Sequence, residues 1–353
     1  MKITVITPFD SSNFGAFLQA YCLKVQLEGM GHTVRHALTR EPEYVTGLYY
    51  KNKPTRKKDI LLRWRFEKKK NYGIHKLGLF QKDQDFFDVI YNAEDTDVYI
   101  LGSDEIWNIK QPAFRQEIFW GIGLDPVISY AASIGSADIK ALSQDTEYVH
   151  AIERLKAVLV RDVQTKQFAE SVGRKAEIVC DPTMLIPVDN YGEKLQDEYI
   201  SAHKCFLVYA YYVSKNEKKA IKAYAKTHGM KVVSCCFWHD WCDYQCECGP
   251  LKFSSLIRQC EAVFTTTFHG SVFSILNHAN FVSVPISPKT NQLLEQFGLK
   301  ERLLPEGEFS ENRLSEVLDR ENNNYEYVEE QIASIREASV EKLETALRIA
   351  CGG

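Results

Sequence analysis

His269 and Gly270 are adjacent in the sequence, and a histidine followed by a glycine at the start of a helix could bind a ligand or transfer a proton. They lie in "TTTFHGSVFSILN", where a β-branched run typical of a strand passes into an apolar, helix-like stretch. A strand that leads into a helix leaves free backbone N–H groups at the helix N-terminus, and such groups bind anions. We therefore predict an anion site formed by Thr267, Phe268, His269 and Gly270.

Charged side chains follow two other predicted strands. In "LGSDEIWN", Asp104 and Glu105 come directly after a short apolar run. Asp104 could accept a proton from a sugar hydroxyl, and the alternative is a side chain that only caps a turn. In "VLVRDVQ", Arg161 suits bidentate recognition of a carboxylate or phosphate, although it could instead pair with Asp162.

The first predicted turn from strand to helix is a fourth candidate. "DSSNFGAFLQA" places Asn13 and Gly15 at a helix start, where backbone N–H groups are free. Gly15 would allow a ligand or another chain segment to approach closely, because it has no Cβ. A capped helix start without a ligand is the alternative interpretation.

Alternating strands and helices determine where these residues must lie. Strand-like runs occur at 3–7, 32–37, 97–101, 127–132, 157–162, 177–181, 205–212, 231–237, 262–267 and 281–286, with helical stretches or turns between most of them. This alternation argues for parallel sheets covered by helices, in which ligands bind beyond the carboxyl ends of the strands. We expect an α/β chain with two Rossmann-like domains facing a cleft.

The domain boundaries follow from where the pattern restarts. We place an N-terminal domain at residues 1–190, with an insertion at 45–80, and a C-terminal domain at 200–325. The amphipathic stretch at 326–353 is expected to be a helix that packs back across the junction of the domains. A length of 353 residues is consistent with two domains.

Bulk properties exclude several classes of protein. A hydrophobic share of 45%, a charged share of 25% and a formal net charge of −4 are those of a globular protein and give no sign of nucleic-acid binding. The start "MKITVITPFD" is not a signal peptide, and no apolar run approaches the length of about 18 residues that spans a membrane. We expect a cytoplasmic protein.

The segment 51–76 interrupts the alternation with many Lys and Arg residues against only Asp59 and Glu67. It allows two interpretations. One is a solvated, charged helix. The other is a flap over the cleft that holds an anionic substrate or makes peripheral contact with the anionic inner face of a membrane.

Ten cysteines follow no pattern typical of secreted domains. Five of them crowd with His239 into "CCFWHDWCDYQCEC", but the spacing lacks the paired CxxC knuckles of structural zinc. We favour reduced thiols in a loop or core, and we predict no metal.

Six short motifs, in this order, resemble the polysaccharide pyruvyl transferase family: "NFGAFLQAY", "GSDEIWN", "SYAASIG", "VRD", "CDPT" and "FHGSVFSI", which together cover residues 13–277. The resemblance implies a fold similar to GT-B glycosyltransferases. It also implies transfer of pyruvate from phosphoenolpyruvate to a saccharide, usually as a ketal, during assembly of a cell-surface polysaccharide. Phosphoenolpyruvate is then a substrate, no cofactor is expected, and the acceptor could be lipid-linked.

The resemblance also implies roles for the residues above. His269 would be the acid or a donor to the phosphate, Asp104 would accept the hydroxyl proton, and Arg161 would hold an anionic group. The remaining candidates for substrate binding are Asn13, Gly15, Glu105, Thr267, Phe268 and Gly270. Asp181 and Thr183 of "CDPT" are interpreted as residues that shape the hinge.

At Thr267 the chain departs from the family, which usually has Arg directly before the hydrophobic-His-Gly element; many members also have Gln in place of Glu105. Losing a charge-assisted contact would cost about 2–3 kcal/mol. Either another cation replaces that Arg, namely Lys289 or the basic segment, or the donor differs. The alternatives are therefore a GT-B-type transferase with a nucleotide-sugar donor and a non-catalytic saccharide-binding relative.

Overall fold

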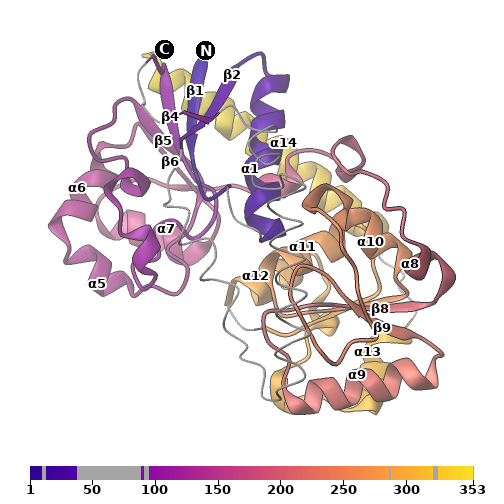
Figure 1. Cartoon of the computed structure of the whole chain (residues 1–353). Coiled ribbons are helices and arrows are strands. Elements are labelled where there is room, and N and C mark those ends of the chain that lie inside the picture. The colour runs from indigo at the N-terminus through magenta and orange to yellow at the C-terminus, as the bar shows by residue number, and fades with distance from the viewer. Residues whose placement is uncertain (10–12, 38–88, 91–94, 286–287, 321–324, 353) are drawn as a thin grey trace.

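The computed structural model describes the chain except residues 10–12, 38–88, 91–94, 286–287, 321–324 and 353. The predicted basic segment at 51–76 therefore lies outside the described residues. The described strands form two parallel sheets, each with helices packed against it, as Figure 1 shows. The predicted α/β architecture of two Rossmann-like domains is confirmed.

The first sheet has seven strands in the order β3-β2-β1-β4-β5-β6-β7. Its strands are β1 (Lys2–Ile6), β2 (Thr33–Ala37), β3 (Val89–Ile90), β4 (Val98–Leu101), β5 (Val127–Ala132), β6 (Ala157–Val160) and β7 (Glu177–Ile178). The described α-helices of this domain are α1 (Phe14–Gly29), α5 (Ile139–Ser143), α6 (Thr146–Arg154) and α7 (Val163–Ser171). Every residue of β4 and β5 is buried, because helices cover both faces of a parallel sheet.

The second sheet has five strands in the order β10-β9-β8-β11-β12. Its strands are β8 (Cys205–Tyr209), β9 (Lys231–Ser234), β10 (Tyr244–Gln245), β11 (Ala262–Thr265) and β12 (Phe281–Ser283). Its α-helices are α8 (Glu198–Ala202), α9 (Lys215–Thr227), α10 (Phe253–Gln259), α11 (Phe268–Leu276), α12 (Pro288–Gln296) and α13 (Glu311–Leu318). In each sheet the strand order reverses beside the first strand of the domain, and parallel sheets bind ligands at such a point.

Several strands are shorter than the apolar runs that predict them. The run 262–267 forms strand only over Ala262–Thr265, because Thr267 turns out of the sheet and caps α11. The run 205–212 likewise ends as strand at Tyr209, and the chain turns there toward the junction between the domains. The short strands β3 and β10 had no counterpart among the predicted elements.

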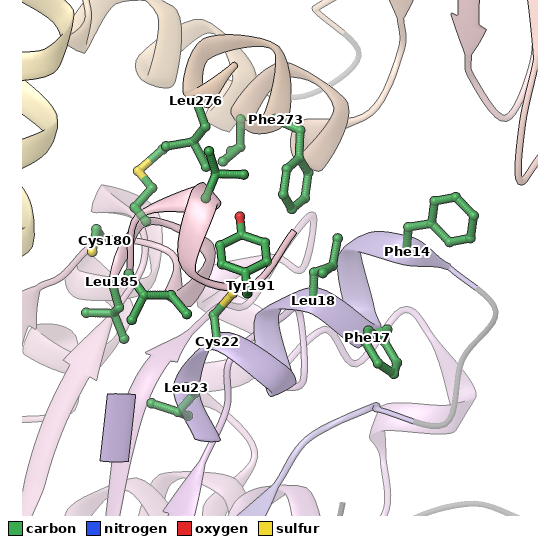
Figure 2. Packing of buried hydrophobic residues seen from close by; sticks show 14 of the residues in the cluster. Phe14, Phe17, Leu18, Cys22, Leu23, Cys180, Leu185, Tyr191, Phe273 and Leu276 are labelled. Atoms are coloured by element: carbon green, nitrogen blue, oxygen red, sulfur yellow. The ribbon is translucent and has the colours of Figure 1, made fainter. Parts of the chain in front are cut away.

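A continuous apolar core joins the two domains. Phe14 of α1 stacks at 6.2 Å on Tyr209 of β8 and meets Phe253 of α10 edge-on at 5.4 Å. Figure 2 shows Tyr191, from the connection between the sheets, lying between α1 and Phe273 of α11. The N-terminal half of α1 is therefore part of the interface as well as of the first domain.

The last helix, α14 (Tyr325–Ala350), spans the junction as predicted (Figure 1). Near its start, the Tyr325 hydroxyl donates to the Ala279 carbonyl beside the second sheet, at 2.8 Å. Further along, Arg336 Nε donates to Met184 O at 2.7 Å, and Ser339 Oγ accepts from Cys180 N at 2.9 Å. One helix is thus fastened to both domains. No helix in the described part of the chain is long and apolar enough to cross a membrane.

The burial of α14 predicts a large effect of truncating its core side chains. Leu343 is fully buried in the cluster that includes Tyr130 of β5, so Leu343→Ala should lower the free energy of unfolding by about 2–5 kcal/mol. Glu344, the next residue, is exposed, and Glu344→Ala should change the free energy of unfolding by about 0.5 kcal/mol or less. Urea denaturation of both variants measures this difference, and equal effects would contradict the burial of Leu343 in this cluster.

Candidate functional site

The predicted site residues come together where the carboxyl ends of the two sheets face each other. Arg161 follows β6, Asp104 and Glu105 follow β4, and His269 lies in the first turn of α11 after β11. Asp104 and Arg161 are 57 residues apart in the sequence, and His269 lies a further 108 residues along the chain. The parallel topology of both sheets brings them to one place.

Asp181 connects the two central residues of this site. Its Oδ2 accepts a hydrogen bond from Arg161 Nη1 at 2.9 Å and lies 3.6 Å from His269 Nε2. Its Oδ1 accepts from the backbone N and side-chain hydroxyl of Thr183, at 3.1 and 2.7 Å. Burial by itself raises the pKa of Asp181, but His269 and Arg161 lower it well below its usual range. Asp181 therefore stays ionised and can orient the imidazole.

Arg161 is a buried cation with unused donors. Its side chain is 3% exposed, and neither Nε nor Nη2 donates a hydrogen bond to any described residue. Nη2 lies 3.8 Å from Asp104 Oδ1, and the guanidinium carbon lies 4.9 Å from the centre of the Phe268 ring. His269 Nε2 is likewise buried without a hydrogen-bond partner in the described structure. Buried polar groups are normally satisfied, so these atoms indicate a place for a polar ligand.

Helix α1 of the first domain packs directly on the histidine of the second. A Cβ on Gly15 would lie within 3.0 Å of the ring atoms Nδ1 and Cγ of His269. Asn13 caps the same helix by accepting from Gly15 N at 3.0 Å, and its Nδ2 donates to the Tyr211 hydroxyl at 2.7 Å. Gly15 therefore gives room to a side chain of the other domain, and Asn13 ties the two domains together.

Asp104 has an unusual backbone for a residue with a side chain. Its φ is 73°, a region that costs a non-glycine residue about 1–3 kcal/mol. The conformation is held because Ser133 N donates to the Asp104 carbonyl at 3.0 Å and Asp104 N donates to Ser103 Oγ at 2.6 Å. Asp104 Oδ1 accepts from Glu105 N at 2.8 Å, whereas Oδ2 accepts no hydrogen bond within the described chain. The free oxygen could accept a hydroxyl proton.

Glu105 forms an ion pair across the junction with Lys289 of α12. Asn108 Nδ2 also donates to Glu105 Oε2 at 3.0 Å. Burial opposes ionisation of Glu105, but Lys289, with smaller contributions from Arg161 and Asn108, lowers its pKa to about 2. Glu105 therefore stays ionised at neutral pH.

Thr267 and Gly270 shape the start of α11. The Thr267 hydroxyl accepts from Gly270 N at 2.9 Å and lies 3.1 Å from Thr265 Oγ1. A Cβ on Gly270 would overlap the Thr265 side chain. Thr267 is thus an N-cap whose hydroxyl is already engaged, and the Gly270 N–H is satisfied within the chain. Phe268 lies beside Arg161 and Lys289.

Three residues of this site were not among the predicted site residues. Asp181 was interpreted as a hinge residue; its place after β7, at the same sheet edge as Arg161, was the available signal. Lys289 was considered only as a replacement for a missing arginine. Tyr211 carried no recognised motif. Asp162, the alternative partner of Arg161, instead caps α7 and accepts from Ser133 Oγ at 2.6 Å.

The cysteine-rich segment 235–248 follows β9 and contains β10, and its Phe237 ring lies 4.5 Å from the ring of Tyr211. All ten cysteines of the chain are free thiols. Burial raises the pKa of Cys235 to about 11, so its reactive thiolate is scarce at neutral pH. The described residues contain no group of three or more His, Cys, Asp or Glu side chains arranged to hold a metal ion.

Comparison with solved structures identifies the class of fold. The S. aureus MnaA–UDP complex superposes with a TM-score of 0.55 at 12% identity, covering 98% of this chain and 96% of that chain. The UDP-GlcNAc 2-epimerase of Neisseria meningitidis bound to UDP-GlcNAc gives 0.53 at 12% identity, with 98% and 100% covered. HepE of Anabaena in complex with UDP-glucose gives 0.54 at 9%, with 98% and 100% covered. The chain therefore has a GT-B-like fold, as predicted.

The sequence narrows this class to one family. The chain belongs to the polysaccharide pyruvyl transferase family, whose model matches residues 13–288. This match covers most of both sheets and every site residue described above except Lys289. The family predicted from the six motifs is confirmed. A search of curated proteins finds no match to the chain.

The contact between Gly15 and His269 predicts a selective effect of one methyl group. Gly15→Ala should force the imidazole or α1 to shift and should lower the free energy of unfolding by about 1–3 kcal/mol. Gly29 ends the same helix and would have nothing within 4 Å of its Cβ, so Gly29→Ala should be neutral or stabilising by up to about 1 kcal/mol. Chemical denaturation of the pair tests this, and equal stabilities would rule out close packing on His269.

The ion pair of Glu105 predicts a pH-dependent stability. Because its folded pKa of about 2 lies below its ordinary 4.5, the pair contributes fully above pH 4.5 and is lost as the pH falls toward 2. Glu105→Gln should therefore cost about 1–3 kcal/mol at pH 7, and its deficit relative to wild type should shrink between pH 4.5 and 2. The free energy of unfolding measured across this range checks the prediction. A deficit that does not change with pH would contradict it.

Proposed function

We propose that this protein transfers pyruvate from phosphoenolpyruvate to two hydroxyls of a saccharide, as a ketal, during assembly of a cell-surface polysaccharide. The observation that carries the proposal is the buried Arg161, whose Nε and Nη2 donate no hydrogen bond in the described structure. Beside it, His269 Nε2 also makes no hydrogen bond there, although Asp181 Oδ2 lies 3.6 Å away. The donor has a carboxylate and a phosphate, which are the groups that guanidinium and imidazole donors recognise. Membership of the family supports the same reaction class.

The reaction requires a defined movement of protons. C3 of phosphoenolpyruvate gains a proton, and the oxygen of a first hydroxyl bonds to C2 as that hydroxyl loses its proton. The oxygen of the second hydroxyl then bonds to C2 as the C2–O bond to phosphate breaks. The two hydroxyl protons balance the proton gained at C3 and the one that leaves with inorganic phosphate.

The side chains at the junction supply groups for these steps. His269, oriented by Asp181, is the proposed acid at C3 or donor to the departing phosphate. Arg161 is the proposed ligand of one anionic group of the donor, through its two unused nitrogens. Asp104 Oδ2 is the proposed acceptor of a hydroxyl proton, because its other oxygen is already engaged.

One set of observations favours a second candidate, a GT-B-type transferase with a nucleotide-sugar donor. Structural neighbours of this fold are described in complex with UDP, UDP-GlcNAc or UDP-glucose. Thr267 stands where members of the pyruvyl transferase family usually have Arg. Calorimetric titration of the wild-type protein with phosphoenolpyruvate and with UDP-sugars separates the two candidates.

The proposed roles predict different effects for two variants. His269→Ala should reduce the rate of pyruvyl transfer by about 10²–10⁴-fold, because the positioned acid is lost. Arg161→Lys keeps the charge but loses the forked geometry, and it should weaken phosphoenolpyruvate binding by about tenfold or more. The rate of transfer is measured from the release of inorganic phosphate, and the affinity for phosphoenolpyruvate is measured by calorimetry.

His150→Ala is the matched control, because His150 is exposed on α6. It should leave both transfer and binding unchanged. Unaltered transfer in His269→Ala would refute the role of His269, and wild-type protein that binds a UDP-sugar but not phosphoenolpyruvate would favour the second candidate.

A further inference from the structure

Two cations lie near one aromatic ring at the start of α11. The Phe268 ring has the Arg161 guanidinium carbon 4.9 Å from its centre and the Lys289 ammonium 5.3 Å from its centre. Arg161 comes from the first domain and Lys289 from the second. Phe268 is therefore in favourable cation–π contact with one cation from each domain.

Lys289 is held in this position by Glu105, 184 residues away in the sequence. Glu105 is itself fixed, because Asn108 donates to its other oxygen at 3.0 Å. Gly135 packs against the same carboxylate, where a Cβ would overlap it. The Lys289 side chain is 18% exposed, which distinguishes it from a solvated surface pair.

Lys289 has capacity for a further partner. An ammonium has three N–H donors, and in the described structure Lys289 gives one hydrogen bond, to Glu105. The remaining donors can bind an anion while the contact with Glu105 persists. Thr267 stands in the place of the family's usual arginine and has no charge. Its hydroxyl already accepts a hydrogen bond from Gly270 N as the N-cap of α11.

We propose that Lys289 is the second cation of the donor site and binds an anionic group of a phosphate-bearing donor, with Glu105 as the residue that positions it. Arg161 then takes one anionic group of the donor and Lys289 the other. The inference rests on the proposed function, because that function identifies the donor as phosphoenolpyruvate. It adds that Lys289 supplies the positive charge that Thr267 lacks in the place of the family's usual arginine.

The charges around the site set the direction of the effects. Two cations, Arg161 and Lys289, stand among three carboxylates, those of Asp104, Glu105 and Asp181. Removing the charge of Lys289 makes the site more repulsive to an anion. Removing the charge of Glu105 makes the site less repulsive to an anion. A glutamine at that position can still accept a hydrogen bond from Lys289 through its amide oxygen.

Calorimetric titration with phosphoenolpyruvate tests the proposal. Lys289→Gln should weaken binding at least tenfold, Lys289→Arg should restore it to within about threefold of wild type, and Glu105→Gln should tighten it about threefold or more. In steady-state transfer, Lys289→Gln should raise the KM for phosphoenolpyruvate and leave kcat within about threefold. A purely structural role would give the same loss in the Gln and Arg variants.

Lys300→Gln is the matched control, because Lys300 also pairs with a glutamate, Glu295, but is 73% exposed and outside the site. It should bind as wild type does. Wild-type affinity in Lys289→Gln, or equal losses in Lys289→Gln and Lys289→Arg, would overturn the proposal.

The same variants distinguish failure of this inference from failure of the proposed function. If the wild-type protein does not bind phosphoenolpyruvate, the proposed function fails, and UDP becomes the probe. At least tenfold weaker UDP binding by Lys289→Gln, restored by Lys289→Arg, then supports Lys289 as the second cation of a phosphate site. Unchanged UDP binding, or wild-type protein that binds neither ligand, overturns it.

Discussion

The ion pair between Arg161 and Asp181 is the interaction on which the junction depends. A guanidinium removed from water is costly unless a carboxylate meets it with good geometry, and Asp181 Oδ2 does so at 2.9 Å. The same oxygen lies 3.6 Å from His269 Nε2. The Asp181 carboxylate therefore both compensates the burial of Arg161 and orients His269.

Local patterns in the sequence predict most of the elements of this fold. The run 127–132 is strand over its whole length, because it is apolar, rich in β-formers and bounded by Pro126 and a turn. The order of strands is not local information, because β4 lies beside β1 although β2 and β3 separate them in the chain. The short β10 lies within the cysteine-rich segment, where no apolar alternation marks it.

The site shows the same division between local and distant information. His269, Arg161 and Asp104 could be predicted because each follows its own strand. The pairing of Lys289 with Glu105 could not, because it joins α12 of the second domain to the loop after β4 of the first. The capping role of Thr267 was within reach, since Thr before a helix and three residues ahead of Gly270 is a typical N-cap.

The packing of Gly15 on His269 makes the site a composite of two domains. The histidine belongs to the second domain, whereas the surface that supports its ring and the carboxylate that faces it belong to the first. In evolutionary terms, the two domains are not interchangeable parts. A recombination that joined this first domain to the second domain of a distant relative would preserve both folds, yet it would have to fit the histidine to the glycine again before the site could form.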